Sequence, residues 1–331
     1  MKRFTFLTAL ALAFVLALSV AASAAPKVMK ISLTAARDRS YVQSMFWFAE
    51  QIEKNTNGAI KAQVYTDSQL GGDRDNVEGL QMGSIQGSLM SPGALGAFAK
   101  RLNAIGMPFI FKDAATAHKV LDSDLARELF EDLAKINVIG LNYWENGFRN
   151  LTNSKVDVKS VSDIAGLKLR TTEVALYIDA WRALGSDPTP MAFAELFTAL
   201  QQKVVDGQEN PIGNIVTQRF YEVQKYLTMT RHVYDPLVFM TSKKFWNSLS
   251  AEEKAILQKT ADDARDHQRK LNAQEEIDGI EFLKSKGVVV TELTDEAHAE
   301  FVKKMTPIYE KYGKDIGEEY FNRLRKAAQG E

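Results

Sequence analysis

Residues 29–64 read MKISLTAARDRSYVQSMFWFAEQIEKNTNGAIKAQV, and their pattern predicts the architecture of the chain. Apolar and polar residues alternate at 29–33 and again at 60–64, which is the periodicity of a half-buried strand. Residues 40–55 between them carry apolar side chains at helical spacing, and Asn57-Gly58 follows as a helix stop. This strand–helix–strand order predicts an α/β protein with a largely parallel sheet.

The rest of the chain repeats this alternation. Further strands are expected at 86–91, 138–141, 167–170, 204–205 and 288–290. Helices are expected at 74–82, 114–135, 174–184 and 192–202, and a helical tail runs to residue 328.

A much longer helix is expected in the last third of the chain. Ser250 followed by Glu253 forms a capping box, and the helical pattern then continues almost unbroken to Lys286. A polar helix of this length usually bridges domains. Two shorter helices broken near Asn272 are the alternative.

The N-terminus has the pattern of an export signal. Lys2 and Arg3 precede an apolar run from Phe4 to about Val20, and the small residues 21–25 follow. This predicts a signal peptide over residues 1–25, cleaved near residues 24–25, and a periplasmic protein. An uncleaved membrane anchor is the alternative, although the run is barely long enough to span a bilayer.

Composition narrows the class of protein further. The 331 residues include no cysteine, so disulfides, thiolate metal ligands and a lipid-anchored cysteine are all excluded. The chain is long enough for two domains, and no later segment resembles a transmembrane helix. A formal net charge of −1 gives no basic surface for nucleic acid.

Catalytic signatures are missing from the sequence. The four histidines form no HExxH pattern, and there is no Gly-x-Ser-x-Gly elbow, P-loop or GxGxxG motif. We therefore expect neither an enzyme nor a metal site or other cofactor. An exported hydrolase is the alternative, and it would need a nucleophile–base pair that the sequence does not indicate.

Two arginines stand out instead. Arg149 lies in Tyr143–Thr152, directly after the strand expected at 138–141, and Arg170 ends the strand expected at 167–170. Ligands of open α/β sheets bind beyond the carboxyl ends of the strands, so both arginines would point into one crevice. A guanidinium group matches a carboxylate with two parallel hydrogen bonds. Two solvated salt bridges are the alternative.

A third segment favours the first interpretation. Residues 188–211 end in Val-Asp-Gly-Gln-Glu-Asn-Pro, at 205–211, and together with the two arginine segments they resemble the DctP-type binding proteins of tripartite ATP-independent periplasmic (TRAP) transporters. Further motifs lie at 69–72, 79–85 and 107–111, so the resemblance covers essentially the whole chain after the signal peptide.

The resemblance implies a fold and a domain division. It implies a two-lobed periplasmic binding protein fold, with two α/β domains around a ligand cleft and the long helix bridging both. Domain I would comprise 26–147 and about 237–275, and domain II 148–236 and about 276–331. The partners implied are a small organic acid and the integral membrane subunits of a TRAP transporter, with the binding protein itself a monomer.

The resemblance also implies site residues. Arg170 would clamp the ligand carboxylate bidentately, Arg149 would supply a second cationic contact, Asn210 would hydrogen bond beside them and Phe193 would pack on the ligand. Further residues would line the cleft: Thr34, Ala35, Arg37, Asp73, Arg74, Ser91, His232 and Tyr234.

Glu173 bears on the identity of the ligand. It follows Arg170 by three residues, where the family places another pocket residue. A carboxylate there would repel a second carboxylate on the ligand but would accept hydrogen bonds from hydroxyl groups. We therefore expect a sugar acid such as a hexuronate or aldonate. A C4-dicarboxylate such as malate or succinate, held by Arg37 and Arg74, is the alternative, and a component of another importer or a sensor is a further one.

Overall fold

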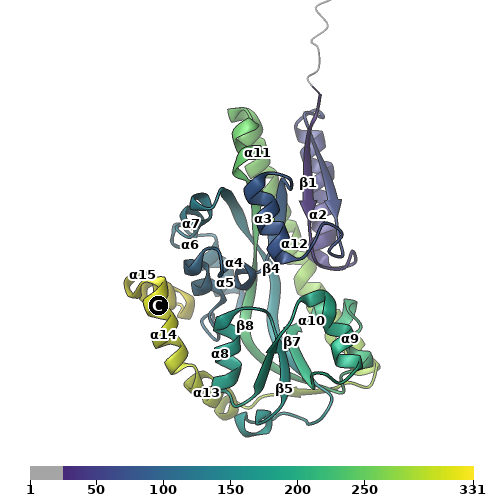
Figure 1. Cartoon of the computed structure of the whole chain (residues 1–331), viewed down its shortest axis with the longest axis vertical. Coiled ribbons are helices and arrows are strands. Elements are labelled where there is room, and N and C mark those ends of the chain that lie inside the picture. Colours follow the sequence, from purple (N-terminus) through teal and green to yellow (C-terminus); the bar gives the residue numbers. More distant parts are fainter. Residues whose placement is uncertain (1–24) are drawn as a thin grey trace, which may run out of the picture.

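The computed structural model describes residues 25–331 (Figure 1). The signal peptide expected at 1–25 lies almost wholly outside these residues, and its cleavage stays a prediction. The strands are β1 (Lys27–Ser32), β2 (Ile60–Tyr65), β3 (Gly87–Met90), β4 (Val138–Asn153), β5 (Lys168–Thr171), β6 (Asp187–Pro190), β7 (Gly207–Pro211), β8 (Tyr226–Ser242) and β9 (Val289–Glu292).

Helices cover the sheet on both sides. They are α2 (Ser40–Asn55), α3 (Asp73–Met82), α4 (Pro92–Leu95), α5 (Ala114–Leu121), α6 (Asp124–Arg127), α7 (Phe130–Lys135), α8 (Ala175–Ala183), α9 (Leu196–Gln201), α10 (Ile212–Thr217), α11 (Lys243–Ser248), α12 (Ala251–Ser285), α13 (Asp295–Lys304), α14 (Thr306–Ile316) and α15 (Glu318–Gln329). In the part of the chain that the structure describes, none is long and apolar enough to cross a membrane.

The strands form one mixed sheet, in the order β2-β1-β3-β8-β4-β7-β5-β6, with β9 beside β8. The strands at the two ends pair in parallel, β1 with β2 and β3, and β5 with β6 and β7. The middle is antiparallel, because β8 pairs with β3 and β4, and β4 pairs with β7. The expectation of a largely parallel sheet is therefore wrong in the middle of the molecule.

The two long strands β4 and β8 cause this difference. They run from one lobe into the other (Figure 1), and register shifts interrupt their pairing at three points. Only the first residues of β4 were expected as a strand, and β8 was not expected at all. Buried polar residues such as Asn142, Glu145 and Asn150 break the apolar alternation of β4, so its pattern does not look like a strand.

Each lobe is built on one end of the sheet. The strands β1, β2 and β3 with α2 and α3 form one end, and β5, β6 and β7 with α8, α9 and α10 form the other (Figure 1). This two-lobed α/β architecture agrees with the expected fold class. The exact residues at which one domain passes into the other stay a prediction.

The long helix was predicted correctly. α12 spans 35 residues, and Ser250 and Glu253 form the expected capping box. The helix continues through the buried Asn272, so the alternative of two shorter helices is wrong. α12 packs against α2 in one lobe, β4 in the middle and α10 in the other lobe, and it therefore bridges them.

Two local expectations were wrong. The helix expected at 114–135 is three short helices, α5, α6 and α7, and the strand expected at 204–205 lies instead at Gly207–Pro211. Lys203 adopts a φ of 59°, so the chain turns after α9 before β7 begins.

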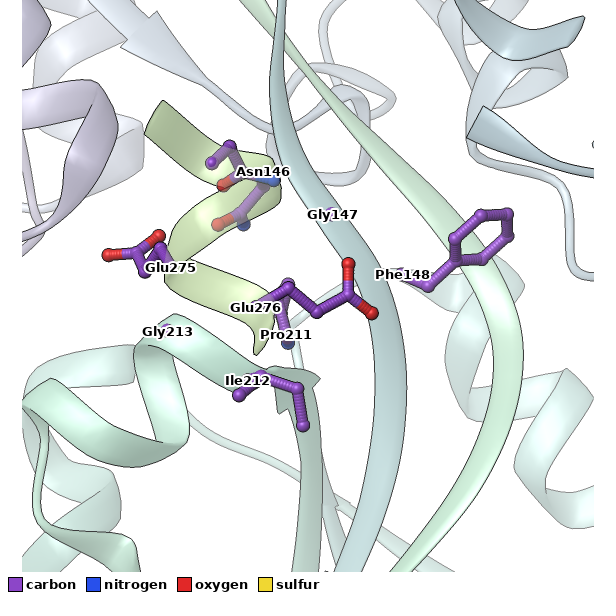
Figure 2. A pocket seen from close by; sticks show the side chains of 9 residues that line it. Asn146, Gly147, Phe148, Pro211, Ile212, Gly213, Glu275 and Glu276 are labelled. Carbon is purple, nitrogen blue, oxygen red and sulfur yellow. The ribbon is translucent and has the colours of Figure 1, made fainter. Parts of the chain in front are cut away.

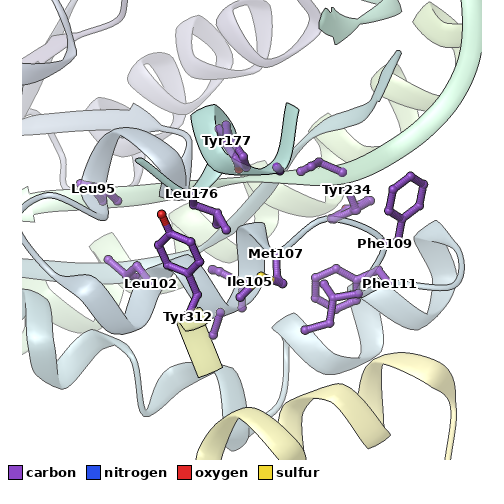
Figure 3. Packing of buried hydrophobic residues seen from close by; sticks show 14 of the residues in the cluster. Leu95, Leu102, Ile105, Met107, Phe109, Phe111, Leu176, Tyr177, Tyr234 and Tyr312 are labelled. Atoms are coloured by element: carbon purple, nitrogen blue, oxygen red, sulfur yellow. The ribbon is translucent and has the colours of Figure 1, made fainter. Parts of the chain in front are cut away.

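The largest apolar core joins segments that are distant in sequence. Leu102, Ile105 and Met107 pack with Tyr177 of α8 and with Tyr312 of α14 (Figure 3). The C-terminal helices are thereby fixed to the segment that precedes α5, and α8 is held in a defined position directly after the strand that carries Arg170.

Candidate ligand-binding site

Arg170, the third residue of β5, is only 2% exposed. Its Nε and Nη2 donate to the carbonyl oxygen of Met191 at 3.0 and 2.7 Å, and the centroid of the Phe193 ring lies 5.9 Å from its Cζ. Nη1 is buried and has no hydrogen-bond partner among residues 25–331. Since Nη1 and Nη2 present two parallel N–H groups, this end of the guanidinium can hold a carboxylate.

The charged guanidinium group of Arg170 is shielded from water, and no carboxylate of the described residues contacts it. Burial and the charge of Arg149 lower the pKa of Arg170, whereas Glu209, Asp73 and Glu173 raise it, and the net result is a pKa of about 10. Arg170 is therefore still protonated at neutral pH. A buried cation without a paired anion is unfavourable, so this position favours the arrival of an anion.

Arg149 lies within β4, not beyond the end of a strand as expected, and its charge is already neutralised. Its Nε and Nη2 contact the two carboxylate oxygens of Glu209 at 2.5 and 2.9 Å, and Nη1 donates to Asp235 Oδ2 at 2.7 Å. Burial lowers the pKa of Arg149, but these two carboxylates outweigh burial and raise it above its ordinary value. An arginine has five N–H groups. Nη2 makes a fourth contact, to Glu209 O at 2.7 Å, and one N–H on Nη1 is then left over.

The two arginines lie on either side of β7. In the sheet Arg149 is opposite Pro211, and Arg170 is opposite Gln208. Asn210 lies between them on β7 and is 2% exposed; its Oδ1 accepts from Arg149 Nη2 at 3.3 Å. The structure therefore brings Arg149, Arg170 and Asn210 into one region of the sheet, with Phe193 beside them.

His232 joins this region through Glu209. Its Nε2 lies 2.9 Å from Glu209 Oε2, and its Nδ1 lies 2.7 Å from Thr230 Oγ1. Burial lowers the pKa of His232, although its hydrogen bond to Glu209 acts in the opposite direction. Burial would raise the pKa of Glu209, but the charge of Arg149 and the hydrogen bond from His232 bring it down to about 2. Glu209 is therefore ionised at neutral pH and remains paired with Arg149.

The other lobe contributes polar groups near Arg170. Asp73 begins α3, is half-buried and accepts a hydrogen bond from Thr34 Oγ1 at 3.3 Å. Burial raises the pKa of Asp73, the Thr34 bond and the charge of Arg170 lower it, and Asp235 and Glu173 raise it. Ser91 Oγ donates to Asp235 Oδ1 at 2.5 Å, while Glu173 itself is exposed.

Four other residues expected in the cleft contact different groups. Arg37 is exposed and stacks on Phe46, with 4.1 Å from Cζ to the ring centroid, and Arg74 is exposed and pairs with Glu78. Ala35 is buried in an apolar core. The Tyr234 ring packs on Phe111 and Phe148, at centroid distances of 5.5 and 5.3 Å.

Sequence reasoning missed two carboxylates that organise the site. In the sequence, Glu209 belongs to the motif at 205–211, and Asp235 belongs to none of the motifs described above. Both are almost fully buried, in strands β7 and β8. A carboxylate inside a buried strand must be paired, because an unpaired buried charge is very unfavourable. Asp235 precedes the apolar residues 237–240, so its position in a buried strand could have indicated a paired carboxylate. This inference requires β8 to be recognised as a strand, and the sequence pattern did not predict β8.

A very small hollow, with a volume of about 10 Å³, lies beside this network, between α10, α12 and β4 (Figure 2). Glu275 and Glu276 of α12 line it, and burial raises the pKa of Glu276. Two acidic side chains make this hollow a poor place for an organic anion. Residues 25–331 hold no group of three or more side chains of the types that bind metal ions.

The fold and the site together define a class of protein. Two α/β lobes joined by crossing strands and a bridging helix, with a buried and incompletely paired arginine on a strand of one lobe, are the features of a two-lobed solute-binding protein. Within that class, the chain belongs to the family described as bacterial extracellular solute-binding protein, family 7 (DctP), which matches residues 31–315.

Similar proteins agree with this assignment. The sugar acid binding protein of Advenella mimigardefordensis in complex with galactonate superposes with a TM-score of 0.89 at 36% identity, covering 92% of this chain and 98% of that one. A TRAP periplasmic solute-binding protein from Polaromonas bound to D-erythronate gives a TM-score of 0.87 at 39% identity, covering 90% and 98%. The C4-dicarboxylate-binding periplasmic protein DctP of Rhodobacter capsulatus is 34% identical, covering 96% of both chains.

The assignment confirms the expected family. The chain is a solute-binding protein of the DctP family, and the proteins similar to it include TRAP periplasmic solute-binding proteins whose structures hold organic acids.

Proposed function

We propose that this protein captures a hydroxylated monocarboxylate, such as a hexuronate or an aldonate, and delivers it to TRAP membrane subunits in the periplasm. The observation that carries this proposal is the buried Nη1 of Arg170, which has no partner among the described residues. A ligand carboxylate would accept from Nη1 and Nη2 of Arg170 and from the remaining Nη1 proton of Arg149. Phe193 would pack against the ligand from the side.

The contacts of Arg170 leave a place for one carboxylate on the ligand. Arg149 faces the two carboxylates of Glu209 and Asp235, whereas Arg170 contacts no carboxylate among residues 25–331. One buried cation stabilises one buried anion. A second ligand carboxylate would lie near two further acidic side chains, Asp73 and Glu173, and like charges placed close together are unfavourable.

The same acidic groups favour hydroxyls on the ligand. A carboxylate accepts hydrogen bonds and donates none, so Asp73 and Glu173 suit a ligand that is rich in O–H groups. Thr34 and Ser91 add hydroxyls that both donate and accept. The proteins bound to galactonate and D-erythronate are consistent with this chemistry.

The C4-dicarboxylate alternative depends on a second free cation in the cleft. Arg37 and Arg74 are exposed and engaged elsewhere, with Phe46 and Glu78 respectively. A dicarboxylate would therefore require one of them to leave its present contact, and for this reason we favour the sugar acid.

Delivery requires export and lobe closure. The proposal includes removal of the signal peptide at residues 24–25, a monomer of two domains with the boundaries given above, and hinge closure around the ligand. Closure excludes water from the carboxylate–Arg170 pair, and this strengthens their attraction.

A thermal-shift screen tests the proposal. Galactonate, galacturonate and erythronate should raise the melting temperature of the mature protein, since a ligand at 100 times its Kd adds about 2.7 kcal/mol of stability. Arg170→Ala should abolish the shift. Arg182→Ala is the matched control, because Arg182 is a surface residue of α8 paired with Asp179. A shift with succinate or malate alone would replace the sugar acid by a dicarboxylate, and no shift with any acid would refute the proposal.

A further inference from the structure

Arg39 is a buried arginine that the proposed carboxylate site does not use. It lies between β1 and α2, and its side chain is completely shielded from solvent. Nη1 donates to Glu275 Oε2 of α12 at 2.7 Å, and Nη2 donates to Asn146 Oδ1 of β4 at 2.7 Å. Arg39 thereby connects the loop after β1 with the bridging helix and with one of the crossing strands.

Gly213 of α10 lies so close to Arg39 that no side chain fits there. A Cβ at Gly213 would lie 1.2 Å from Arg39 Nη1 and 2.7 Å from the carboxyl carbon of Glu275. Figure 2 shows Gly213 and Glu275 near each other, on α10 and α12. The guanidinium group of Arg39 therefore packs directly against the backbone of α10 at Gly213, and we call this position its seat.

This contact joins the two lobes. α10 follows β7 directly, and three strands (β3, β8 and β4) separate β7 from β1 in the sheet. A loop after β1 can meet the start of α10 only when the two ends of the sheet fold toward each other. The contact between Arg39 and Gly213 is therefore sensitive to the angle between the lobes.

Hydrogen bonds lead from Arg39 to the ligand site. Asn146 accepts from Arg39 through Oδ1, and its Nδ2 donates to Asp235 Oδ2 at 2.9 Å. The same Asp235 oxygen accepts from Arg149 Nη1 at 2.7 Å. Arg39 thus fixes the side-chain amide of Asn146. Asn146 in turn orients the Asp235 carboxylate, which pairs with Arg149.

We propose that Arg39 is an interlobe latch and a positioning residue for the ligand site. Its guanidinium group is seated between Gly213 and Glu275 only when the lobes are closed, and the Asn146–Asp235 contacts then fix Arg149. The inference rests on the proposed function, because closure around a ligand is the motion that the latch stabilises. A contact made in one of two conformations shifts the equilibrium toward that conformation.

Two substitutions test the latch, one on each side of the contact between Arg39 and Gly213. Gly213→Ala suits a helix better than glycine does, so α10 should remain intact while the new methyl group occupies the seat. Arg39→Ala removes the guanidinium group, and Glu275 still accepts from Ser40 N at 3.0 Å and from Ser40 Oγ at 2.8 Å. Each substitution should raise the Kd for galactonate at least about tenfold, because apparent affinity falls with the closed fraction.

The double variant distinguishes a latch from two unrelated losses. With Arg39 already alanine, the methyl group at position 213 no longer meets a guanidinium group, and the Glu275 carboxylate, 2.7 Å away, can move into the space that Arg39 leaves. Arg39→Ala/Gly213→Ala should therefore bind galactonate about as well as Arg39→Ala alone, since contacting residues are not additive. Losses that simply add would overturn the latch. Arg323→Ala, a surface arginine paired with Glu128, is the control and should leave binding unchanged.

A distance measurement separates closure from general damage. The chain has no cysteine, so Lys54→Cys on α2 and Thr198→Cys on α9, both exposed, can carry spin labels without background. With saturating galactonate the labels should move closer in the parent protein and remain further apart in the Arg39→Ala and Gly213→Ala variants. A loss of affinity without a change in distance would show a purely structural role and would overturn the latch.

The two proposals fail in different ways. If the parent binds galactonate and both variants match it in affinity and distance, the latch is wrong and the proposed function stands. If the parent binds no organic acid, the proposed function is wrong. The ligand-free distances then decide the latch, which requires Arg39→Ala to lose short distances that the parent populates.

Discussion

Arg149 and Arg170 are neighbours across β7, both almost fully buried, and they differ in what surrounds them. Arg149 contacts two carboxylates, whereas Arg170 contacts a single backbone carbonyl and keeps one nitrogen unpaired among the described residues. Burial acts on both, yet the pKa of Arg149 is raised and that of Arg170 is lowered to about 10. The same residue type is therefore paired with carboxylates within the sheet in one place and, in the function proposed above, meets the ligand in the other.

Removing Arg149 should produce the largest effect, and it should appear in folding. Arg149→Ala leaves Glu209 and Asp235 as buried carboxylates without their cation, and breaking a buried pair costs about 3–5 kcal/mol. The free energy of unfolding in urea measures this. The control is Arg231→Ala, whose exposed pair with Glu292 is worth at most about 1 kcal/mol. Equal losses in the two variants would contradict the role assigned to Arg149.

Removing Arg170 should instead affect binding. Arg170→Ala should weaken the binding of a sugar acid by about 3 kcal/mol or more, the usual cost of breaking a buried pair. The free energy of unfolding should change little, because the side chain gives up only its bonds to the Met191 carbonyl and a desolvated charge. Calorimetric titration measures the affinity, and urea unfolding measures the free energy of unfolding. Near-normal affinity would remove Arg170 from the site, and a large loss of stability would remove the contrast with Arg149.

This contrast marks the limit of what the sequence predicts. The helix at 40–55, the long helix after Ser250 and the strand that carries Arg170 follow from periodicity and capping, which are local signals. The family resemblance added the region in which Arg149, Arg170 and Asn210 meet. Local signals do not say which arginine has acidic neighbours, because Glu209 and Asp235 are distant from Arg149 in sequence.

The remaining parts of the site could not be predicted because they depend on strands that the sequence pattern does not show. Strand β8 brings His232 and Asp235 to the site, yet its polar residues hide the alternation on which strand prediction depends. The surroundings of Arg37 and Tyr234 are likewise set by contacts with Phe46 and Phe148, whereas Arg74 pairs with Glu78 one turn further along α3. A position in a motif indicates which lobe a residue belongs to, but only packing decides which way its side chain points.

The Arg149 side of the comparison should also be sensitive to acid. The pKa of His232 is lower in the folded protein than the ordinary 6.5, so the unfolded chain binds the proton first. Its contribution is therefore present above pH 6.5 and is lost as the pH falls below that value, on the order of 1 kcal/mol for one unit of pKa difference. Glu209, with a pKa of about 2, adds a second loss below pH 4.5.

Urea unfolding at pH 7.5 and 5.5 measures the histidine effect. His232→Asn should flatten the dependence between these two values. The pKa of His298 is also lowered, by burial and by the charge of Arg231, so His298→Asn is the necessary comparison. If His298→Asn alone removed the dependence, the acid sensitivity would belong to the surface of α13 and not to the Arg149 network.

The Arg170 side should respond to alkali, with the smallest effect of the series. A ligand carboxylate would raise the pKa of Arg170 from about 10, so binding near pH 10 should take up a fraction of a proton, and affinity should fall as the pH passes 10. Calorimetry in buffers of different ionisation enthalpy counts that proton. Arg149 should contribute nothing, because its two carboxylates already hold its pKa above the ordinary value with or without ligand. Binding at pH 10 with no proton uptake would mean that the carboxylate does not meet Arg170, and the difference between the two arginines would then lie only in their protein partners.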